Sequence, residues 1–305
     1  FLSDEFLAIH RFCHQGVKRI LKTKQNVFMY SANGHGAWEA SLVNLLSPGD
    51  KVLMLESGHF SASWEEMCND LGIKVETLGA DWRMGTDMDA VKKRLKADAK
   101  GEIKAVLVVH NETSTGLVHP IGEVRKAIDA AKHGAFLLTD TISSLGCMDF
   151  RFDEWGVDVA VSGSQKGLML PTGLSLTGVS NKALEASGKA KSVRHYWSWK
   201  DAMKREPQKF PGTTPVHIFY GLEEGIKLME EEGLEAIFQR PSDRTSTISW
   251  ASFLSAKTYS TRTRTSWSFT VRGSIIAMPL MSACERLRYA LNCASPFSPR
   301  ACETA

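Results

Sequence analysis

Lys166 has the sequence surroundings of a lysine that could attack an aldehyde. It comes after an apolar run at residues 157–162 and lies among small residues, with Gly167 next to it. Partial burial disfavours an ammonium ion and lowers its pKa, so that the neutral amine can form a Schiff base. The alternative is a solvated loop lysine, which is the more common state of a lysine considered alone.

Asp140 closes another apolar run, residues 136–139, and is therefore expected at the carboxyl end of a strand. A carboxylate paired with the ring nitrogen of a pyridine cofactor keeps that nitrogen protonated, and the ring then withdraws electrons from a carbanion at the substrate Cα. The alternative is an aspartate that caps a helix or closes a turn.

Two further segments could bind the rest of such a cofactor. Residues 31–36, which include Asn33, Gly34 and His35, open a predicted helix, where amide groups and the helix dipole favour a phosphate. Residues 110–116, which include Thr113, offer hydroxyls and an amide after a third apolar run. Each segment could instead be an ordinary turn or polar loop. The order of phosphate turn, aromatic residue, hydroxyl loop, acid and lysine points to pyridoxal 5′-phosphate (PLP).

A regular alternation of helices and strands up to about residue 235 supplies the scaffold for these residues. It predicts an α/β fold with a mostly parallel sheet flanked by helices. The strands are expected at 26–31, 51–55, 74–77, 105–110, 135–139, 157–162 and 174–179, and the helices at 6–21, 36–46, 59–71, 88–97, 122–131 and 215–231. Ligands collect at the carboxyl ends of such strands. The site is therefore expected just after Ser31, Leu55, His110, Thr139 and Ser162.

The composition changes after Arg240, because residues 241–270 contain fifteen Ser or Thr and a single acid. We therefore divide the chain into a PLP-binding large domain, residues 1–235, and a C-terminal segment, residues 236–305, which we interpret as a degenerate or truncated small domain. A change of reading frame is the interpretation that we favour. A divergent native tail and a disordered extension are the alternatives.

The charge distribution does not support nucleic-acid binding. The net charge is +3, but residues 241–305 contribute eight Lys/Arg and three Asp/Glu, or +5, so the remainder carries −2. No apolar stretch is long enough for a membrane span, and no signal peptide is expected at the start. The six cysteines form no C-x-x-C pair, which predicts reduced thiols, no metal site and a cytoplasmic protein.

Five strings resemble those of the class V, fold-type I PLP-dependent aminotransferases, with most similarity to the serine–glyoxylate and alanine–glyoxylate aminotransferase family. They are L-S-P-G-D (46–50), H-N-E-T-S-T-G (110–116), D-E-W-G-V-D-V-A (153–160), S-G-S-Q-K-G-L-M-L-P-T-G-L (162–174) and E-E-G-L-E (231–235). The two longest are quite specific, and the resemblance covers about residues 5–240.

The resemblance implies a role for each matching residue. Lys166 would be the Schiff-base lysine and Asp140 the partner of the pyridine nitrogen. The residues that would contact the cofactor elsewhere are Asn33, Gly34 and His35 on the phosphate side, Phe60 stacked on the ring, Thr113 and Gln165. Thr213, in a register shared with Thr214, would reach the phosphate of a neighbouring subunit, which implies a homodimer with shared active sites.

The implied reaction is transamination of L-serine or L-alanine with the 2-oxo acid glyoxylate to give glycine. The family's Gly/Pro-rich N-terminal segment and its R-I-G-H-type motif, whose arginine binds the substrate carboxylate, are not found. A PLP-binding, dimerising but catalytically impaired fragment therefore remains an alternative. A cysteine desulfurase is a second alternative, although that chemistry uses a loop cysteine and a histidine over the ring, where this chain has Phe60.

Overall fold

The computed structural model describes residues 3–79, 81–205 and 210–240. The C-terminal residues 241–305, on which the prediction of a degenerate small domain and a change of reading frame falls, lie outside them. The division of the chain after residue 235 therefore stays a prediction. No helix within the described ranges is both long and apolar enough to cross a bilayer.

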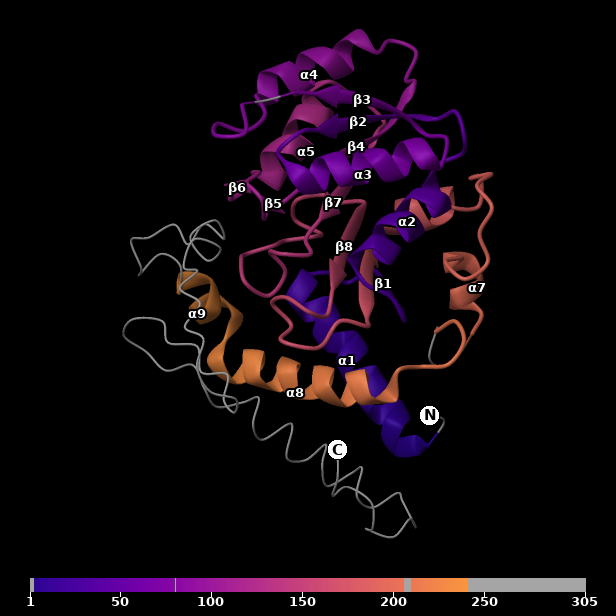
Figure 1. Ribbon diagram of the computed structural model, residues 1–305, viewed down its shortest axis with the longest axis vertical. Coiled ribbons are helices and arrows are strands. Elements are labelled where there is room, and N and C mark those ends of the chain that lie inside the picture. The colour runs from indigo at the N-terminus through magenta and orange to yellow at the C-terminus, as the bar shows by residue number, and fades with distance from the viewer. Residues whose placement is uncertain (1–2, 80, 206–209, 241–305) are drawn as a thin grey trace, which may run out of the picture. The chain divides into compact units, whose positions relative to one another are not determined.

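A seven-stranded sheet forms the centre of the described part (Figure 1). Its spatial order is β1-β9-β8-β7-β4-β2-β3. The strands are β1 (Asn26–Tyr30), β2 (Lys51–Leu55), β3 (Lys74–Leu78), β4 (Ile103–Val109), β7 (Phe136–Asp140), β8 (Val159–Gly163) and β9 (Ser175–Val179). A separate two-stranded hairpin, β5 (Asn111–Glu112) with β6 (Leu117–Val118), follows β4 directly.

Strand β9 runs against its two neighbours, β1 and β8, whereas the other four pairings are parallel. Two reversals in succession leave β1 pointing the same way as β8. The carboxyl ends of β1, β2, β4, β7 and β8 therefore meet at one edge of the sheet. This confirms the predicted mostly parallel sheet, and it places all five predicted ligand positions on the same side.

Helices cover both faces of the sheet, and successive strand residues alternate between two apolar cores. In β1, Val27 and Met29 belong to one core and Phe28 and Tyr30 to the other. The first core is closed by α1 (Asp4–Leu21), α4 (Met88–Ala97), α5 (Ile121–Ala130) and α8 (Val216–Glu232). The second is closed by α2 (Gly34–Leu45), α3 (His59–Asp70), α6 (Asn181–Ala186) and α7 (Trp199–Met203).

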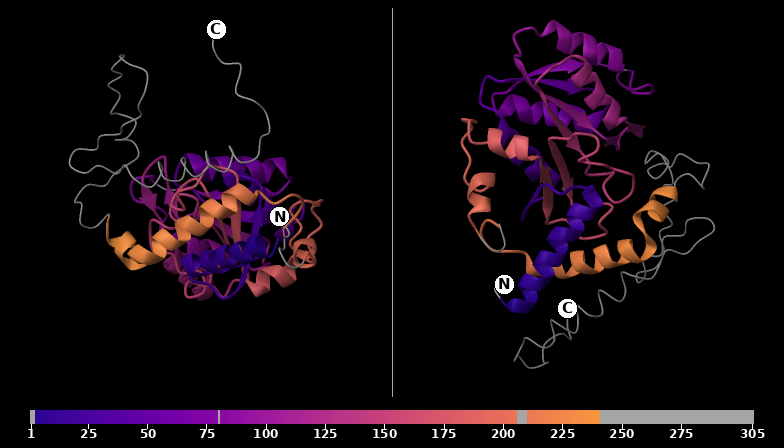
Figure 2. Two further views of the ribbon diagram at one scale, coloured as in Figure 1. Left: turned by 90° about the horizontal axis from the view of Figure 1, so that it is seen from below. Right: turned by 180° about the vertical axis from the view of Figure 1, so that it is seen from behind.

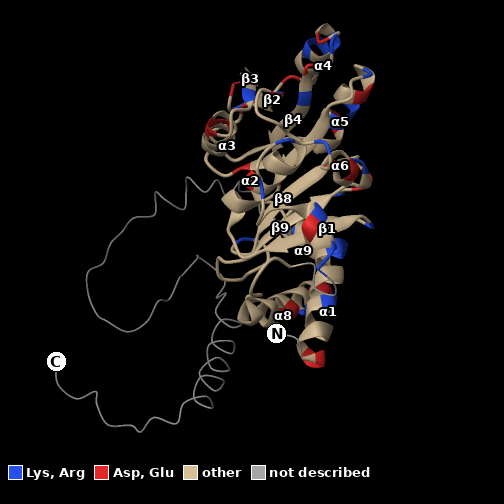
Figure 3. Ribbon diagram, turned by 90° about the vertical axis from the view of Figure 1, so that its right-hand side faces the viewer, with Lys and Arg blue, Asp and Glu red and all other residues tan. Residues whose placement is uncertain are grey.

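Helix α1 shows how the sequence fixes an element's ends. Ser3 accepts a hydrogen bond from the Phe6 amide, and the first turn carries Asp4 and Glu5. The last turn carries Lys18 and Arg19, so both ends complement the helix dipole (Figure 3). Helix α8 packs beside α1 (Figure 2), and α9 (Leu234–Gln239) continues from it.

Every predicted strand and helix is present, with ends displaced by at most two residues. The short helices α6, α7 and α9 and the hairpin β5–β6 were not predicted. The three helices have six residues or fewer and the two hairpin strands two residues each, which is too short to show a clear hydrophobic period.

Candidate active site

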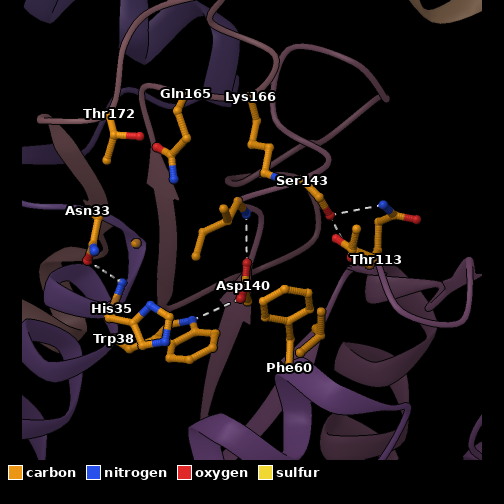
Figure 4. A pocket seen from close by; sticks show the side chains of 14 residues that line it. Asn33, His35, Trp38, Phe60, Thr113, Asp140, Ser143, Gln165, Lys166 and Thr172 are labelled. Carbon is orange, nitrogen blue, oxygen red and sulfur yellow. Dashed lines mark hydrogen bonds between the residues drawn. The ribbon is translucent and has the colours of Figure 1, made fainter. Parts of the chain in front are cut away.

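A cavity of about 330 Å³ opens where the strands' carboxyl ends meet (Figure 4). Residues that end or follow five different strands line it: Asn33, Gly34, His35, Trp38, Phe60, Val109, Asn111, Thr113, Asp140, Ile142, Ser143, Gln165, Lys166 and Thr172. Eight of the nine site residues predicted from the sequence are among them. The fold therefore brings together side chains that are more than 130 positions apart in the chain.

Asp140, the last residue of β7, lies at the floor of the cavity and is 4% exposed. Its Oδ1 accepts a hydrogen bond from the Ile142 amide at 2.7 Å, and its Oδ2 accepts one from the Trp38 indole at 2.8 Å. Burial nevertheless raises the pKa of Asp140 to about 7, because desolvation outweighs both hydrogen bonds. A cationic partner in the cavity would restore the ionised form.

Trp38 is a site residue that the sequence reasoning missed. It is fully buried on α2 and stacks on Trp64 of α3, with ring centroids 5.6 Å apart and planes 13° apart. A tryptophan on the apolar face of a helix looks like an ordinary core residue. Only its indole N–H, aimed at Asp140, sets it apart, and sequence spacing does not show that direction.

Asn33, in the turn after β1, is the N-cap residue of α2. Asn33 Oδ1 accepts hydrogen bonds from the amides of His35 at 3.1 Å and Gly36 at 3.3 Å. A phosphate at this helix end would therefore share these amides with Asn33 or displace its side chain. Gly36 is required by close packing, since a Cβ there would lie 2.7 Å from the Ala32 Cβ and 2.9 Å from the Trp197 ring.

The loop after β8 projects Gln165 and Lys166 into the cavity (Figure 4). The Lys166 carbonyl accepts the Met169 amide at 2.9 Å and closes a tight turn. Met169 has a φ of 61°, an uncommon value for a residue with a side chain, which indicates a constrained loop. The Gln165 Oε1 is buried and has no hydrogen-bond partner within the described part of the chain.

Two other lining residues, Asn111 and Ser143, join the loops after β4 and β7. The Asn111 side-chain amide donates to Ser143 Oγ at 2.9 Å, and this hydroxyl donates to the Asn111 carbonyl at 2.6 Å. Neither residue is predicted from the sequence as a site residue, and neither is Thr172 across the cavity. Polar loop residues of this kind are common, and only the folded arrangement shows which of them face the cavity.

Thr213 is the predicted site residue that does not line the cavity. It is exposed, whereas the neighbouring Thr214 is buried and its hydroxyl lacks a partner among the residues described. The implied role of Thr213 lies in a neighbouring subunit, so its position in one chain leaves that role a prediction.

The cavity suits PLP on features of its own. An amine, a buried carboxylate and an aromatic ring face one space, from Lys166, Asp140 and Phe60. The carboxylate with a raised pKa calls for a positive partner, which a protonated pyridine nitrogen would be. The partnerless Gln165 Oε1 belongs to a side chain that lines the same cavity as the Asn33 turn (Figure 4). Whichever end of the Gln165 amide is the oxygen, a polar atom remains for a ligand.

The sequence is similar to known proteins along most of its length. A sequence model described as aminotransferase class-V matches residues 2–265. The serine–glyoxylate aminotransferase of Methylorubrum extorquens is 44% identical over 245 residues, covering 78% of this chain and 61% of that protein. The L-aspartate–glyoxylate aminotransferase of Paracoccus denitrificans is 46% identical, covering 74% of this chain and 58% of that protein.

Among solved structures, the alanine–glyoxylate aminotransferase from Nostoc sp. matches with a TM-score of 0.72 and 29% identity, covering 78% of this chain and 63% of that one. The chain thus spans about three fifths of the length of the curated relatives it matches, 61% and 58% for the two above. The family match also extends past about residue 240, where the resemblance noted in the sequence ends.

Proposed function

Because this chain belongs to the class-V aminotransferase family, we propose that it binds PLP in the cavity and transfers the amino group of a small amino acid to glyoxylate, giving glycine. The observation that carries the proposal is the meeting of Lys166, Asp140 and Phe60 in one cavity at the carboxyl edge of the sheet. Class-V aminotransferases of this fold type are PLP-dependent, and the fold match supports the same cofactor here.

When bound, PLP supplies an aldehyde for amines to attack and a ring that withdraws electrons from the substrate Cα. Lys166 would hold the cofactor covalently, and its Nζ, once displaced by the substrate amine, would take the proton from the substrate Cα and deliver it to C4′, the cofactor carbon that carried the aldehyde. Asp140 would accept a hydrogen bond from the protonated ring nitrogen. The Trp38 indole keeps the Asp140 carboxylate oriented for that contact.

The remaining predicted residues would fix the cofactor's position. Phe60 would pack on one face of the ring, and Thr113 would contact its edge. Asn33, Gly34, His35 and Gln165 would hold the phosphate end. In Figure 4 Asn33, His35 and Gln165 lie on the opposite side of Asp140 from Phe60 and Thr113, an arrangement that suits a ligand with a charged end and a ring.

L-Serine or L-alanine is the donor that we propose. The relatives named above carry serine–glyoxylate, aspartate–glyoxylate and alanine–glyoxylate in their names, so glyoxylate is common to all three. We also propose a homodimer in which Thr213 contacts the partner's cofactor. The exposure of Thr213 outside its own cavity supports that arrangement.

A donor panel tests the proposal. The purified chain with PLP and glyoxylate should form glycine with L-serine or L-alanine, and Lys166→Ala should form none. Lys93→Ala, an exposed lysine on α4, is the matched control and should behave as the wild type. Glycine formation by Lys166→Ala at the wild-type rate would contradict the assignment, and a preference for L-aspartate would correct the donor.

A PLP-binding fragment without turnover is the second candidate, and the observation that favours it is the three-fifths coverage of the relatives. Mixing the PLP-loaded chain with L-serine alone separates the two. Conversion to the pyridoxamine form supports the enzyme, and unchanged cofactor absorbance supports the fragment. Cysteine desulfurase is less favoured, because no cysteine is among the described residues that line the cavity.

A further inference from the structure

Glu112 is a buried carboxylate behind the cavity wall, and the proposed reaction assigns it no role. It is 0% exposed. Its oxygens accept hydrogen bonds from the Phe60 amide at 3.1 and 3.3 Å and the Ser61 amide at 3.2 Å. They also accept from the Ser114 amide at 3.1 Å and the Ser114 hydroxyl at 2.7 Å. The side chain thus joins two segments about fifty residues apart.

Helix α3 depends on these contacts because its own cap residue is Gly58, which has no side chain to offer. The first helical amide, of His59, donates instead to Ser114 Oγ at 2.9 Å. A Cβ on Gly58 would lie 2.4 Å from that oxygen and 2.8 Å from the Glu112 Cγ. The loop after β4 therefore caps α3, and the partial positive charge at the helix N-terminus stabilises the carboxylate.

The same contacts join two walls of the cavity. Asn111 and Thr113 flank Glu112 in sequence, and both line the cavity, whereas Glu112 turns to the helix behind it. Phe60, whose amide Glu112 binds, lines the cavity as well. Figure 4 shows Phe60 and Thr113 together on one side of Asp140. The Glu112 carboxylate therefore links the backbone that carries Phe60 to the loop that carries Thr113.

We propose that Glu112 is a positioning residue for the cofactor. It holds Phe60 and Thr113 at a fixed separation, so that Phe60 contacts the face of the cofactor ring while Thr113 contacts its edge. This inference rests on the proposed binding of PLP. Glu112→Gln keeps the shape but replaces one acceptor oxygen with an NH₂ group, which faces backbone N–H donors and cannot accept from them. The N-terminal end of α3 and the loop after β4 would then separate.

Hydrogen exchange on the cofactor-free chain tests the positioning directly. Glu112→Gln should speed exchange in peptides from residues 57–66 and 111–118 and leave β7 unchanged. Asp98→Asn is the matched control. Asp98 is also a buried carboxylate, and it accepts from the Ile103 amide at 2.7 Å and pairs with His133 at 3.1 Å, away from the cavity lining. Unchanged exchange at both peptides in Glu112→Gln would overturn the proposal.

PLP titration tests the consequence for the cofactor. Glu112→Gln should weaken PLP binding roughly tenfold, equivalent to one hydrogen bond to a charged group, while Asp98→Asn should bind as the wild type. If Glu112 acts through Phe60, the same substitution in a Phe60→Ala background should weaken binding much less. An equal loss in both backgrounds, or no loss in the wild-type background, would overturn the proposal.

These outcomes stay separate from the fate of the proposed function. Equal PLP binding by the wild type and Lys166→Ala would refute the role of Lys166, yet the exchange experiment would still decide whether Glu112 fixes Phe60. Wild-type binding through Lys166 together with an unaffected Glu112→Gln would refute the present inference alone.

Discussion

Asp140 and Trp38 show how individual residues prepare the cavity for a cation. Burial raises the pKa of Asp140 to about 7, although the Trp38 indole and the Ile142 amide both donate to it. The sequence predicted Asp140 from its place at the end of an apolar run, because strand ends follow from the hydrophobic pattern. It could not predict the donor from Trp38, since the direction of an indole N–H depends on how α2 crosses the sheet.

The first prediction concerns the pH dependence of stability in the cofactor-free chain. The pKa of Asp140 is raised in the folded state, so its contribution to stability is full below about pH 4 and is lost as the pH rises through about 7. Asp140→Asn does not titrate. The wild type should therefore lose up to about 4 kcal/mol relative to Asp140→Asn between pH 4 and pH 8, measured by urea unfolding. A difference that stays constant with pH would contradict the burial argument.

The second prediction separates the hydrogen bond of Trp38 from its packing. Trp38→Phe leaves the buried Asp140 Oδ2 without its indole donor and should lower the free energy of unfolding by about 1–3 kcal/mol beyond the packing cost. Trp64→Phe is the control, because the Trp64 indole nitrogen is buried without a partner among the described residues. If urea unfolding shows the same loss in the free energy of unfolding for both variants, the hydrogen bond from the Trp38 indole contributes nothing.

At the scale of elements, the site depends on strand direction. Apolar runs predicted the positions of β1, β4, β7, β8 and β9. An apolar run in a strand that is buried on both faces does not, however, show the direction of that strand relative to its neighbours. The sequence therefore did not show that β9 is antiparallel. The reversal matters because it leaves β1 aligned with β8, so that the Asn33 turn and the Lys166 loop meet at one edge.

The third prediction tests the close packing of the turn that begins α2. Gly36→Ala would place a Cβ 2.7 Å from the Ala32 Cβ, and overpacking of this kind should cost about 1–3 kcal/mol of stability. It should also weaken PLP binding, because the Asn33 turn must shift. Gly134→Ala, where no atom lies within 4 Å, is the control in thermal unfolding and PLP titration. Normal binding by Gly36→Ala would show that the turn does not hold the phosphate.

For the whole molecule, the sequence accounted for the class of fold and for most of the cavity lining. Gln165 and Phe60 came from the family resemblance, whereas Thr113 came from its place in a polar loop after an apolar run as well as from the resemblance. The structure brings all three to the cavity. Asn111, Ser143 and Thr172 were missed, because loop conformation decides which polar side chains face inward. Contacts between the subunits of a dimer involve a second chain, so the fold of one chain does not contain them.

The fourth prediction concerns the shared site of the proposed homodimer. Lys166→Ala and Thr213→Ala chains should each bind PLP weakly alone. When they are unfolded together and refolded as a mixture, mixed dimers should regain one complete site, or roughly a quarter of all sites for random pairing. Sedimentation would establish the dimer, and PLP titration would count the tight sites. A dimeric mixture with no regained tight sites would refute the role of Thr213 across subunits.

The most direct test of the role of Lys166 is to reduce the PLP-loaded chain with borohydride and map the attached cofactor by peptide mass spectrometry. The structure and the family predict one modified peptide, with the added mass on Lys166, and no modification in Lys166→Ala. Labelling confined to another lysine, or equal labelling of the variant, would contradict the assignment of Lys166 as the residue that holds PLP.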